Sequence, residues 1–236
     1  MGLSSRRDSE EYDSYLNVTR ENLLRDIADP TRNKILLDTL AGFEVARVLD
    51  IGCGIGQALF PLAVSRGAFG VGVDVSDKAC RLGDEFYAAH VPGARVAFAR
   101  ARAERLPFAS ASFDVVNFSL ALPYTNNAQA ISEVARVLRP GGLFLLGIHH
   151  TRYYLREFWQ GLTSGDLLPM IHAGRVLAAG TIYHITGRQP LHRRLNETFQ
   201  TKWLLSKELS KYGLTIEREQ PYSTRRAPSF VIFKKS

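Results

Sequence analysis

The sequence predicts an α/β fold, with a mostly parallel seven-stranded sheet, helices on both faces and an insertion after the fifth strand. Short runs rich in β-branched residues alternate with segments of helical periodicity, which is typical of parallel strands covered by helices. This alternation breaks for one long stretch, residues 151–198, and then resumes. We expect residues 1–236 to form a single domain, because this length suits one substantial core.

Two helices are expected before the first strand, within residues 1–43. The segment 10–27 is amphipathic, and Asp29-Pro30 supplies an N-cap and a proline in the first turn of a second helix. That helix is expected to end near Gly42. Residues 1–43, which precede the first strand, are a candidate lid.

The central part of the chain follows the alternation closely. Ser76 is an N-cap for the helix after the second strand, and Arg-Pro-Gly-Gly at 139–142 is expected to end a helix. Pro61 is expected near the first turn of its helix or at a kink. The expected elements are strand 45–51, helix 57–65, strand 70–75, helix 76–89, strand 95–100, strand 113–119, helix 128–138 and strand 143–149.

Residues 151–198 are too long for a plain connection and are rich in aromatic residues, histidine and arginine. We expect this insertion to cover a substrate site. A helix at 201–212 follows and ends at Gly213. Two strands, 214–219 and 229–234, are close enough in sequence to form a β-hairpin.

Composition limits the function classes. Hydrophobic residues make up 45% and charged residues 22% of the chain, as in a globular protein. No apolar run approaches the ~20 residues that span a bilayer, and the first residues lack the apolar segment of a signal peptide. Two cysteines form neither a disulfide framework nor a metal motif, so we expect a cytoplasmic protein without a metal.

The formal net charge is +7, which suits an anionic partner of some kind. The basic residues are scattered and show no stripe with interleaved aromatic residues. Nucleic acid is therefore a less favoured partner than a small-molecule substrate, although the charge does not exclude it. The oligomeric state is left open.

A glycine-rich loop, Val-Leu-Asp-Ile-Gly-Cys-Gly-Ile-Gly-Gln at 48–57, follows the first strand. Gly52 and Gly54 fit a dinucleotide fingerprint, but Gln57 stands where that motif has glycine or alanine. No Gly-Lys-Ser/Thr follows, which excludes a P-loop. The loop indicates a ligand that approaches the backbone closely and has no phosphate there.

Two carboxylates narrow the choice of ligand. Asp50, just before the loop, would repel a pyrophosphate and suits a cationic group. Asp74 ends the second strand, where this topology binds ribose hydroxyls. A ligand with a ribose, a cationic portion and no phosphate matches S-adenosylmethionine.

The sequence resembles the class I S-adenosylmethionine-dependent methyltransferases of the small-molecule branch, strongly over residues 45–150. The resemblance is carried by VLDIGCGIG at 48–56, VGVDVS at 71–76, RAERLPFASASFDVV at 102–116, NFSLAL at 117–122 and ISEVARVLRPGGLFLL at 131–146. It implies a Rossmann-like fold and S-adenosyl-L-methionine as the cofactor.

The same resemblance implies where the cofactor lies. Asp74 would bind the ribose, the backbone at Ala103 and the side chain of Glu104 would lie beside the adenine, and 117–122 would pass under the methionine portion. Arg102 stands where relatives often have aspartate, so its role is open. The expected cofactor-binding residues are Tyr15, Asp50, Gly52, Cys53, Gly54, Gln57, Asp74, Val75, Ala103, Glu104 and Ser119.

Candidate catalytic residues follow the fourth and fifth strands: Tyr124, His149 and His150. Successive strand residues point to opposite faces, so only one of the two histidines is expected to face the site. His172, His184, His192 and Glu197 in the insertion are weaker candidates. A general base is needed only for a hydroxyl or a protonated amine acceptor.

The function predicted is methyl transfer to a small-molecule acceptor by in-line displacement, as O- or N-methylation of a glycan or secondary metabolite. One alternative is a tRNA or rRNA methyltransferase. Another is a non-catalytic module that binds S-adenosylmethionine. The acceptor and the acceptor atom are not determined by the sequence.

Overall fold

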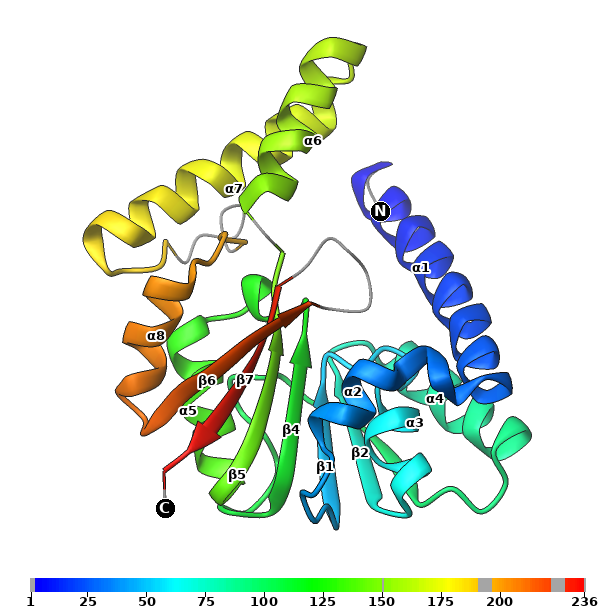
Figure 1. Cartoon of the computed structure of the whole chain (residues 1–236). Helices are drawn as coiled ribbons and strands as arrows, with labels where there is room; N and C mark the ends of the chain where they lie inside the picture. The colour runs from blue at the N-terminus through cyan, green and yellow to red at the C-terminus, as the bar shows by residue number, and fades with distance from the viewer. Residues whose placement is uncertain (1–2, 150, 191–196, 222–227, 236) are drawn as a thin grey trace. The chain divides into compact units, whose positions relative to one another are not determined.

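The computed structural model describes residues 3–149, 151–190, 197–221 and 228–235, without the side chains of 3–13, 15, 221 and 228. The strands form one seven-stranded sheet in the order β3-β2-β1-β4-β5-β7-β6 (Figure 1). Most of the sheet is parallel and its end strands are antiparallel, which confirms the predicted fold class. The chain divides into two compact units, residues 1–102 with 113–117 and residues 103–112 with 118–236.

The first unit holds the amino-terminal helices and the parallel strands beside the glycine loop. Strands β1, β2 and β3 are in parallel register, with Asp50 opposite Gly72 and Gly72 opposite Phe98. The elements are α1 Leu3–Ala28, η1 Pro30–Asn33, α2 Lys34–Thr39, β1 Arg47–Ile51, α3 Leu59–Leu62, η2 Val64–Arg66, β2 Phe69–Asp74, α4 Asp77–His90, β3 Val96–Arg100 and the first residues of β4 Phe113–Ser119.

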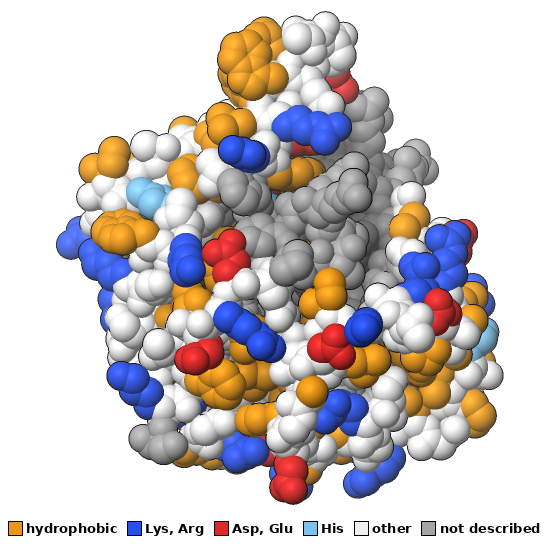
Figure 2. Space-filling model, viewed as in Figure 1, with side chains coloured by type: hydrophobic (Ala, Val, Ile, Leu, Met, Phe, Trp, Pro, Cys, Tyr) orange, Lys and Arg blue, Asp and Glu red, His pale blue; other side chains and the backbone are white. Residues whose placement is uncertain are grey.

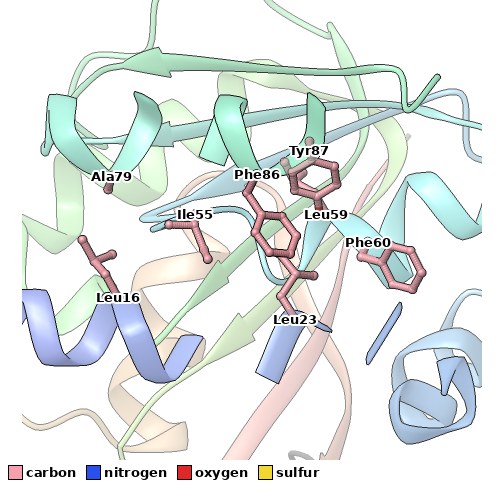
Figure 3. Packing of buried hydrophobic residues seen from close by; sticks show 8 residues of the cluster. All are labelled: Leu16, Leu23, Ile55, Leu59, Phe60, Ala79, Phe86 and Tyr87. Atoms are coloured by element: carbon pink, nitrogen blue, oxygen red, sulfur yellow. The ribbon is translucent and has the colours of Figure 1, made fainter. Parts of the chain in front are cut away.

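A hydrophobic cluster joins α1 to α4 and to the segment after the glycine loop. Leu16 of α1 lies on the side of Ile55 and Ala79, and Leu23 lies by Phe86 of α4 (Figure 3). Leu59, Phe60 and Tyr87 complete the buried set. The amphipathic face predicted for residues 10–27 therefore packs inside this unit over its second half.

Two predicted caps in this unit are confirmed, and two helices are shorter than expected. The Asp29 side chain accepts from Thr31 N, and Ser76 Oγ accepts from Ala79 N. The helix expected at 57–65 is wrong in extent, because only Leu59–Leu62 is α-helical. Pro61 cannot donate a helical hydrogen bond and crowds the carbonyl four residues earlier, so the helix cannot extend back to Gln57. The expected helix before Gly42 likewise divides into η1 and α2.

The second unit contains the rest of the chain. Strand β7 pairs antiparallel with β5 on one side and with β6 on the other, so the predicted hairpin of the last two strands is confirmed. The elements are η3 Leu122–Tyr124, α5 Asn127–Val137, β5 Leu138–Gly147, α6 Thr151–Ser164, α7 Leu167–Thr186, α8 Lys202–Ser210, β6 Leu214–Pro221 and β7 Pro228–Lys234.

The segment Arg-Pro-Gly-Gly was expected to lie between α5 and β5, but it lies inside β5. The strand begins directly at Leu138, the C-cap of α5. Lys234 Nζ donates to the carbonyl oxygens of Ala135 and Leu138, which satisfies groups at the helix end without a glycine cap.

Residues 151–186 of the insertion form a helical hairpin rather than an irregular segment. In α6, a Cβ at Gly161 would lie 2.8 Å from Asp166 O and from Met170 Cβ, and one at Gly174 of α7 would lie 3.5 Å from Phe158. These contacts run in opposite order along the two helices, which are therefore antiparallel. Within the described residues, no helix is both long enough and apolar enough to cross a bilayer.

Candidate functional site

The glycine loop is held by backbone hydrogen bonds and left-handed residues. Gly52, Gly54 and Gly56 have φ of 68°, 54° and 84°. Residues other than glycine rarely adopt this left-handed backbone conformation, which explains why glycine occupies every second position of the loop. A Cβ at Gly56 would lie 2.7 Å from the Phe98 ring, so this third glycine is also required for packing.

Asp50 is a buried carboxylate at the carboxyl end of β1. Its side chain is 3% exposed, and its Oδ1 accepts a hydrogen bond from Asn117 Nδ2 at 2.7 Å. Burial raises the pKa of Asp50 to about 7, Asn117 opposes that rise, and the nearby negative charge of Asp74 adds to it. A cationic ligand would restore the full charge of this carboxylate.

Asp74 is turned toward the glycine loop at the end of β2. Its Oδ2 accepts from Gly54 N at 3.0 Å and its Oδ1 from Ser76 N at 2.8 Å. Each oxygen keeps a further lone pair, so the carboxylate can also accept from a ribose diol. The next residue, Val75, is 61% exposed and offers an apolar surface beside that carboxylate.

Cys53 and Gln57 lie in the loop but have protein partners. The Cys53 thiol is buried, and its hydrogen bond with Cys80, together with burial, holds its pKa well above the usual value. Gln57 Nε2 donates to Asp26 Oδ2 on α1 at 3.2 Å. Both positions stay predictions as cofactor contacts, and the side chain of Tyr15 is outside the described residues.

The second unit contains the remaining predicted cofactor contacts. Ala103 is buried, and Glu104 Oε1 accepts from Asn126 N at 3.0 Å, which fixes the start of α5. A Cβ at Gly147 would lie 2.8 Å from Ser119 Oγ. Leu120, the residue after β4, has φ of 61°, a strained conformation of the kind often found at functional sites.

His149 follows β5 and lies among tyrosines of α6. Its ring stacks on Tyr153 with centroids 4.7 Å apart and meets the edge of Tyr154 at 6.0 Å. Burial lowers the pKa of His149, and the negative charge of Glu197 only partly opposes this. The imidazole is therefore neutral at pH 7 and can accept a proton. His150 lies outside the described residues.

A hydrogen-bonded cluster lies close by in the same unit and contains two of the weaker candidates from the sequence, His172 and Glu197. Glu197 accepts from Tyr154 Oη at 2.9 Å and pairs with His172 Nε2 at 2.8 Å. Burial raises the pKa of Glu197, but hydrogen bonds from His172, Tyr154 and Tyr124 outweigh it and lower the pKa below its usual value. Tyr124, 54% exposed, thus belongs to the same cluster as His149.

His184, the other histidine of α7 in the predicted set, has a packing role. Its Nδ1 lies 2.6 Å from Gly180 O, its Nε2 lies 2.8 Å from Thr201 Oγ1, and its ring stacks on Phe199. Both ring nitrogens are thus engaged with the protein.

The residues of the first unit fit the methionine and ribose portions of S-adenosylmethionine. Asp50 offers a buried carboxylate for a cationic group, and the conformation of Gly52 and Gly54 leaves bare backbone beside it. Asp74 has acceptor capacity for hydroxyl groups. This donor and acceptor set contains no cationic side chain of the kind that binds a phosphate.

Comparison with known proteins agrees with this assignment. Residues 49–146 match the family described as methyltransferase domain. An uncharacterized methyltransferase of Synechocystis is 38% identical over 152 residues, which cover 63% of this chain and 68% of that protein. The 27-O-demethylrifamycin SV methyltransferase of Amycolatopsis mediterranei is 40% identical over 118 residues, 48% of this chain and 43% of that protein.

A solved structure shares the fold. The magnesium protoporphyrin IX methyltransferase of Synechocystis, crystallised with S-adenosylhomocysteine, superposes with a TM-score of 0.57 at 18% identity and covers 94% of this chain and 84% of its own. The 38% identity to the Synechocystis methyltransferase over 68% of its length, together with the family match, shows that the chain belongs to the class I S-adenosylmethionine-dependent methyltransferases, enzymes whose methyl donor is S-adenosyl-L-methionine.

Proposed function

We propose that this methyltransferase transfers the methyl group to a hydroxyl of a small aromatic acceptor, with His149 accepting the hydroxyl proton. The observation that carries the proposal is the position of the His149 imidazole, which follows β5 directly and lies against the rings of Tyr153 and Tyr154, where burial lowers its pKa. The carboxyl ends of the strands are where ligands bind in open α/β sheets.

The reaction needs little chemistry from the protein. The bound cofactor supplies an electrophilic methyl group on a sulfonium. A hydroxyl is a weak nucleophile until it loses its proton, so a base in hydrogen-bond reach speeds the transfer by about 10²–10⁴-fold. His149 meets the protonation requirement, because its lowered pKa keeps it unprotonated at neutral pH.

The surroundings of His149 favour an aromatic acceptor. Tyr124, Tyr153 and Tyr154 lie near it in the same unit, and rings of this kind bind an aromatic acceptor by offset or edge contacts. The rifamycin relative, whose name denotes an O-methylation, is consistent with an oxygen acceptor.

Both cysteines are free thiols, which suits the reducing cytoplasm in which we place the reaction.

The test is an acceptor screen with the full-length protein and methyl-labelled S-adenosylmethionine. Phenolic acceptors are compared with the same compounds already methylated on oxygen, with matched amines and with transfer RNA. We expect label in the free hydroxyl compounds alone. Label in RNA or in amines, with none in any hydroxyl compound, would show that the acceptor class is wrong.

A matched variant tests the base. His149→Ala should lower turnover by about 10²-fold or more while the affinity for S-adenosylhomocysteine stays unchanged. His90→Ala is the control, since His90 stacks on Phe86 in α4 of the other unit. Equal turnover of the His149→Ala variant and the parent would rule out the proposed role of this residue.

A further inference from the structure

The α6–α7 hairpin has an exposed apolar surface, part of which is seen as orange side chains at the top of Figure 2. Both helices pack inward through residues such as Tyr154, Phe158 and Val176 and expose other large hydrophobic side chains. The exposed set, with its exposed fractions, is Leu155 43%, Trp159 60%, Leu162 52%, Leu167 59%, Leu168 64%, Ile171 50%, Ile182 47% and Ile185 80%. Contiguous exposed apolar surface of this kind marks an interaction site.

The exposed residues lie on one side of the hairpin. Successive residues of an α-helix are rotated by about 100° around the helix axis, and in α6 Phe158 faces α7. On this basis Leu155, Trp159 and Leu162 point on average roughly 70° away from Phe158. In α7, Gly174 faces α6. The stripe that runs from Leu168 to Ile185, with alternating spacings of three and four residues, is rotated from Gly174 by roughly the same angle and in the same sense. Because the helices are antiparallel, equal rotations bring both stripes to the same side.

Charged residues are segregated around this apolar face. The exposed arginines Arg156 and Arg175 are rotated in the same sense as the stripes, whereas Glu157 of α6 is rotated in the opposite sense. Arg156 therefore lies beside the apolar face and Arg175 within it, whereas Glu157 lies on the other side of α6. Apolar residues with tryptophan, flanked by arginine, are typical of helices that lie in the interface of an anionic membrane.

We propose that the α6–α7 hairpin docks through this face on the surface of an anionic lipid bilayer. The apolar side chains would enter the boundary between headgroups and acyl chains, and the arginines would reach lipid phosphates while their stems stay along the apolar surface. Docking is peripheral, in agreement with the absence of a membrane-spanning helix among the described residues. The inference concerns the hairpin alone and does not depend on the acceptor.

A second copy of the chain is the less suitable occupant. The stripe on α7 has the spacing of a coiled-coil seam, but Arg175 stands near its middle. In an antiparallel pair about that midpoint, the two copies of Arg175 would approach each other at the centre of the interface. Buried like charges are costly, whereas at a lipid surface each guanidinium can reach a phosphate.

The two tryptophans provide a matched probe, because the chain has no others and their exposed fractions are alike, 60% for Trp159 and 62% for Trp203. Trp203 lies on α8, outside the hairpin. In the Trp203→Phe protein, emission of Trp159 should shift to shorter wavelength with vesicles of phosphatidylcholine and phosphatidylglycerol, and less with phosphatidylcholine alone. In the Trp159→Phe protein, emission of Trp203 should not shift.

Vesicle flotation of the full-length protein gives the second readout. The double variant Leu168→Ser with Ile171→Ser should lower the apparent affinity for the anionic vesicles about tenfold or more, and Trp203→Ser should leave it unchanged. Absence of both flotation and spectral shift would overturn the proposal. Flotation that the double variant does not weaken would also overturn it, because the general positive charge would then be sufficient. A dimer in light scattering that the double variant dissociates would assign the face to a second copy instead.

Discussion

Asn117 Nδ2 donates a hydrogen bond of 2.7 Å to Asp50 Oδ1 and so links β4 to the carboxyl end of β1 inside one compact unit. Asp50 is buried, and burial raises its pKa to about 7 despite this hydrogen bond. At neutral pH roughly half of the unliganded protein therefore holds a proton at this site. A ligand with an ammonium group should displace that proton, because a nearby cation favours the carboxylate.

Proton release on cofactor binding is the first prediction. Titration with S-adenosylhomocysteine near pH 7 should release less than one proton per molecule, because the protonated fraction of Asp50 loses its proton when the ligand's ammonium group binds. Calorimetry in two buffers of different ionisation enthalpy measures this release directly. Asp50→Asn should abolish the release and weaken binding. An observed heat that does not depend on the buffer would contradict the raised pKa.

The same carboxyl group predicts how stability depends on pH without ligand. The pKa of Asp50 is about 7 in the folded protein against an ordinary value of 3.8, so the folded state holds more protons between these values. Its contribution to stability is most favourable below the lower value and is lost as pH rises through the interval. Urea unfolding of Asp50→Asn should therefore depend less on pH from about 4 to 7 than the parent does, and the exposed control Asp38→Asn should behave like the parent.

The position of Asp50 and Asp74 could be predicted from the sequence because both end parallel strands, and the carboxyl ends of neighbouring parallel strands meet at one edge. The residues that contact Gln57 and Gly56 could not be predicted from the sequence. Gln57 bonds to Asp26 and Gly56 packs on Phe98, contacts between residues about 30 and 40 positions apart that depend on how α1 and β3 pack.

The insertion shows a second limit of the sequence. Helix α7 is apolar both on the side that packs and on the side that is exposed, so it lacks the alternation of polar and apolar faces that predicts a surface helix. The hydrogen bond between His172 of α7 and Glu197 joins residues 25 positions apart and requires the hairpin to be formed first. Neither residue is part of a recognisable motif, which is why the sequence makes both only weak candidates for the site.

The pH dependence of turnover tests His149 more sharply than its removal alone. Burial lowers the pKa of His149, so the rate should be constant at neutral pH and fall only in acid, below the ordinary value of 6.5. Glu197→Gln removes a negative charge that raises this pKa, and should move the acid limb to still lower pH. An acid limb above 6.5, or one that Glu197→Gln does not move, would point to another group.

The pair of His172 and Glu197 should stabilise the fold within a limited pH range. The hydrogen bond to Glu197 raises the pKa of His172, so its contribution is complete below 6.5 and is lost as pH rises through the folded value. The pKa of Glu197 is lowered, so its contribution is present above 4.5 and is lost as pH falls through the folded value. The pair is thus most effective between about 4.5 and 6.5.

Glu197→Gln should remove this maximum from a plot of unfolding midpoint against pH, and nuclear magnetic resonance should show a lower pKa for His172. The control is Glu21→Gln, which breaks an exposed pair with Arg25 of 3.4 Å on α1. Exposed pairs contribute little, so its profile should follow the parent. If both variants give the same profile as the parent, the pair of His172 and Glu197 has no measurable effect on stability.

Phe98 is enclosed by glycines, which makes its surroundings sensitive to a single added carbon. A Cβ would lie 2.6 Å from the ring at Gly83, 2.7 Å at Gly56 and 2.9 Å at Gly72. The ring cannot move away from one without meeting another. Gly83→Ala should therefore destabilise the protein by about 1–3 kcal/mol in urea unfolding, although alanine is the better helix former.

The cause can be separated from a general loss of packing by changing the ring. In a Phe98→Leu background, which is itself destabilised, Gly83→Ala should become neutral or stabilising by up to about 1 kcal/mol, because the clash is gone and helix propensity remains. Gly174→Ala in α7 is the matched control, since its nearest neighbour, Phe158, is at an ordinary 3.5 Å, and it should stabilise in either background. If Gly83→Ala costs the same with Phe98 as with leucine, the glycine is not there to make room for the ring.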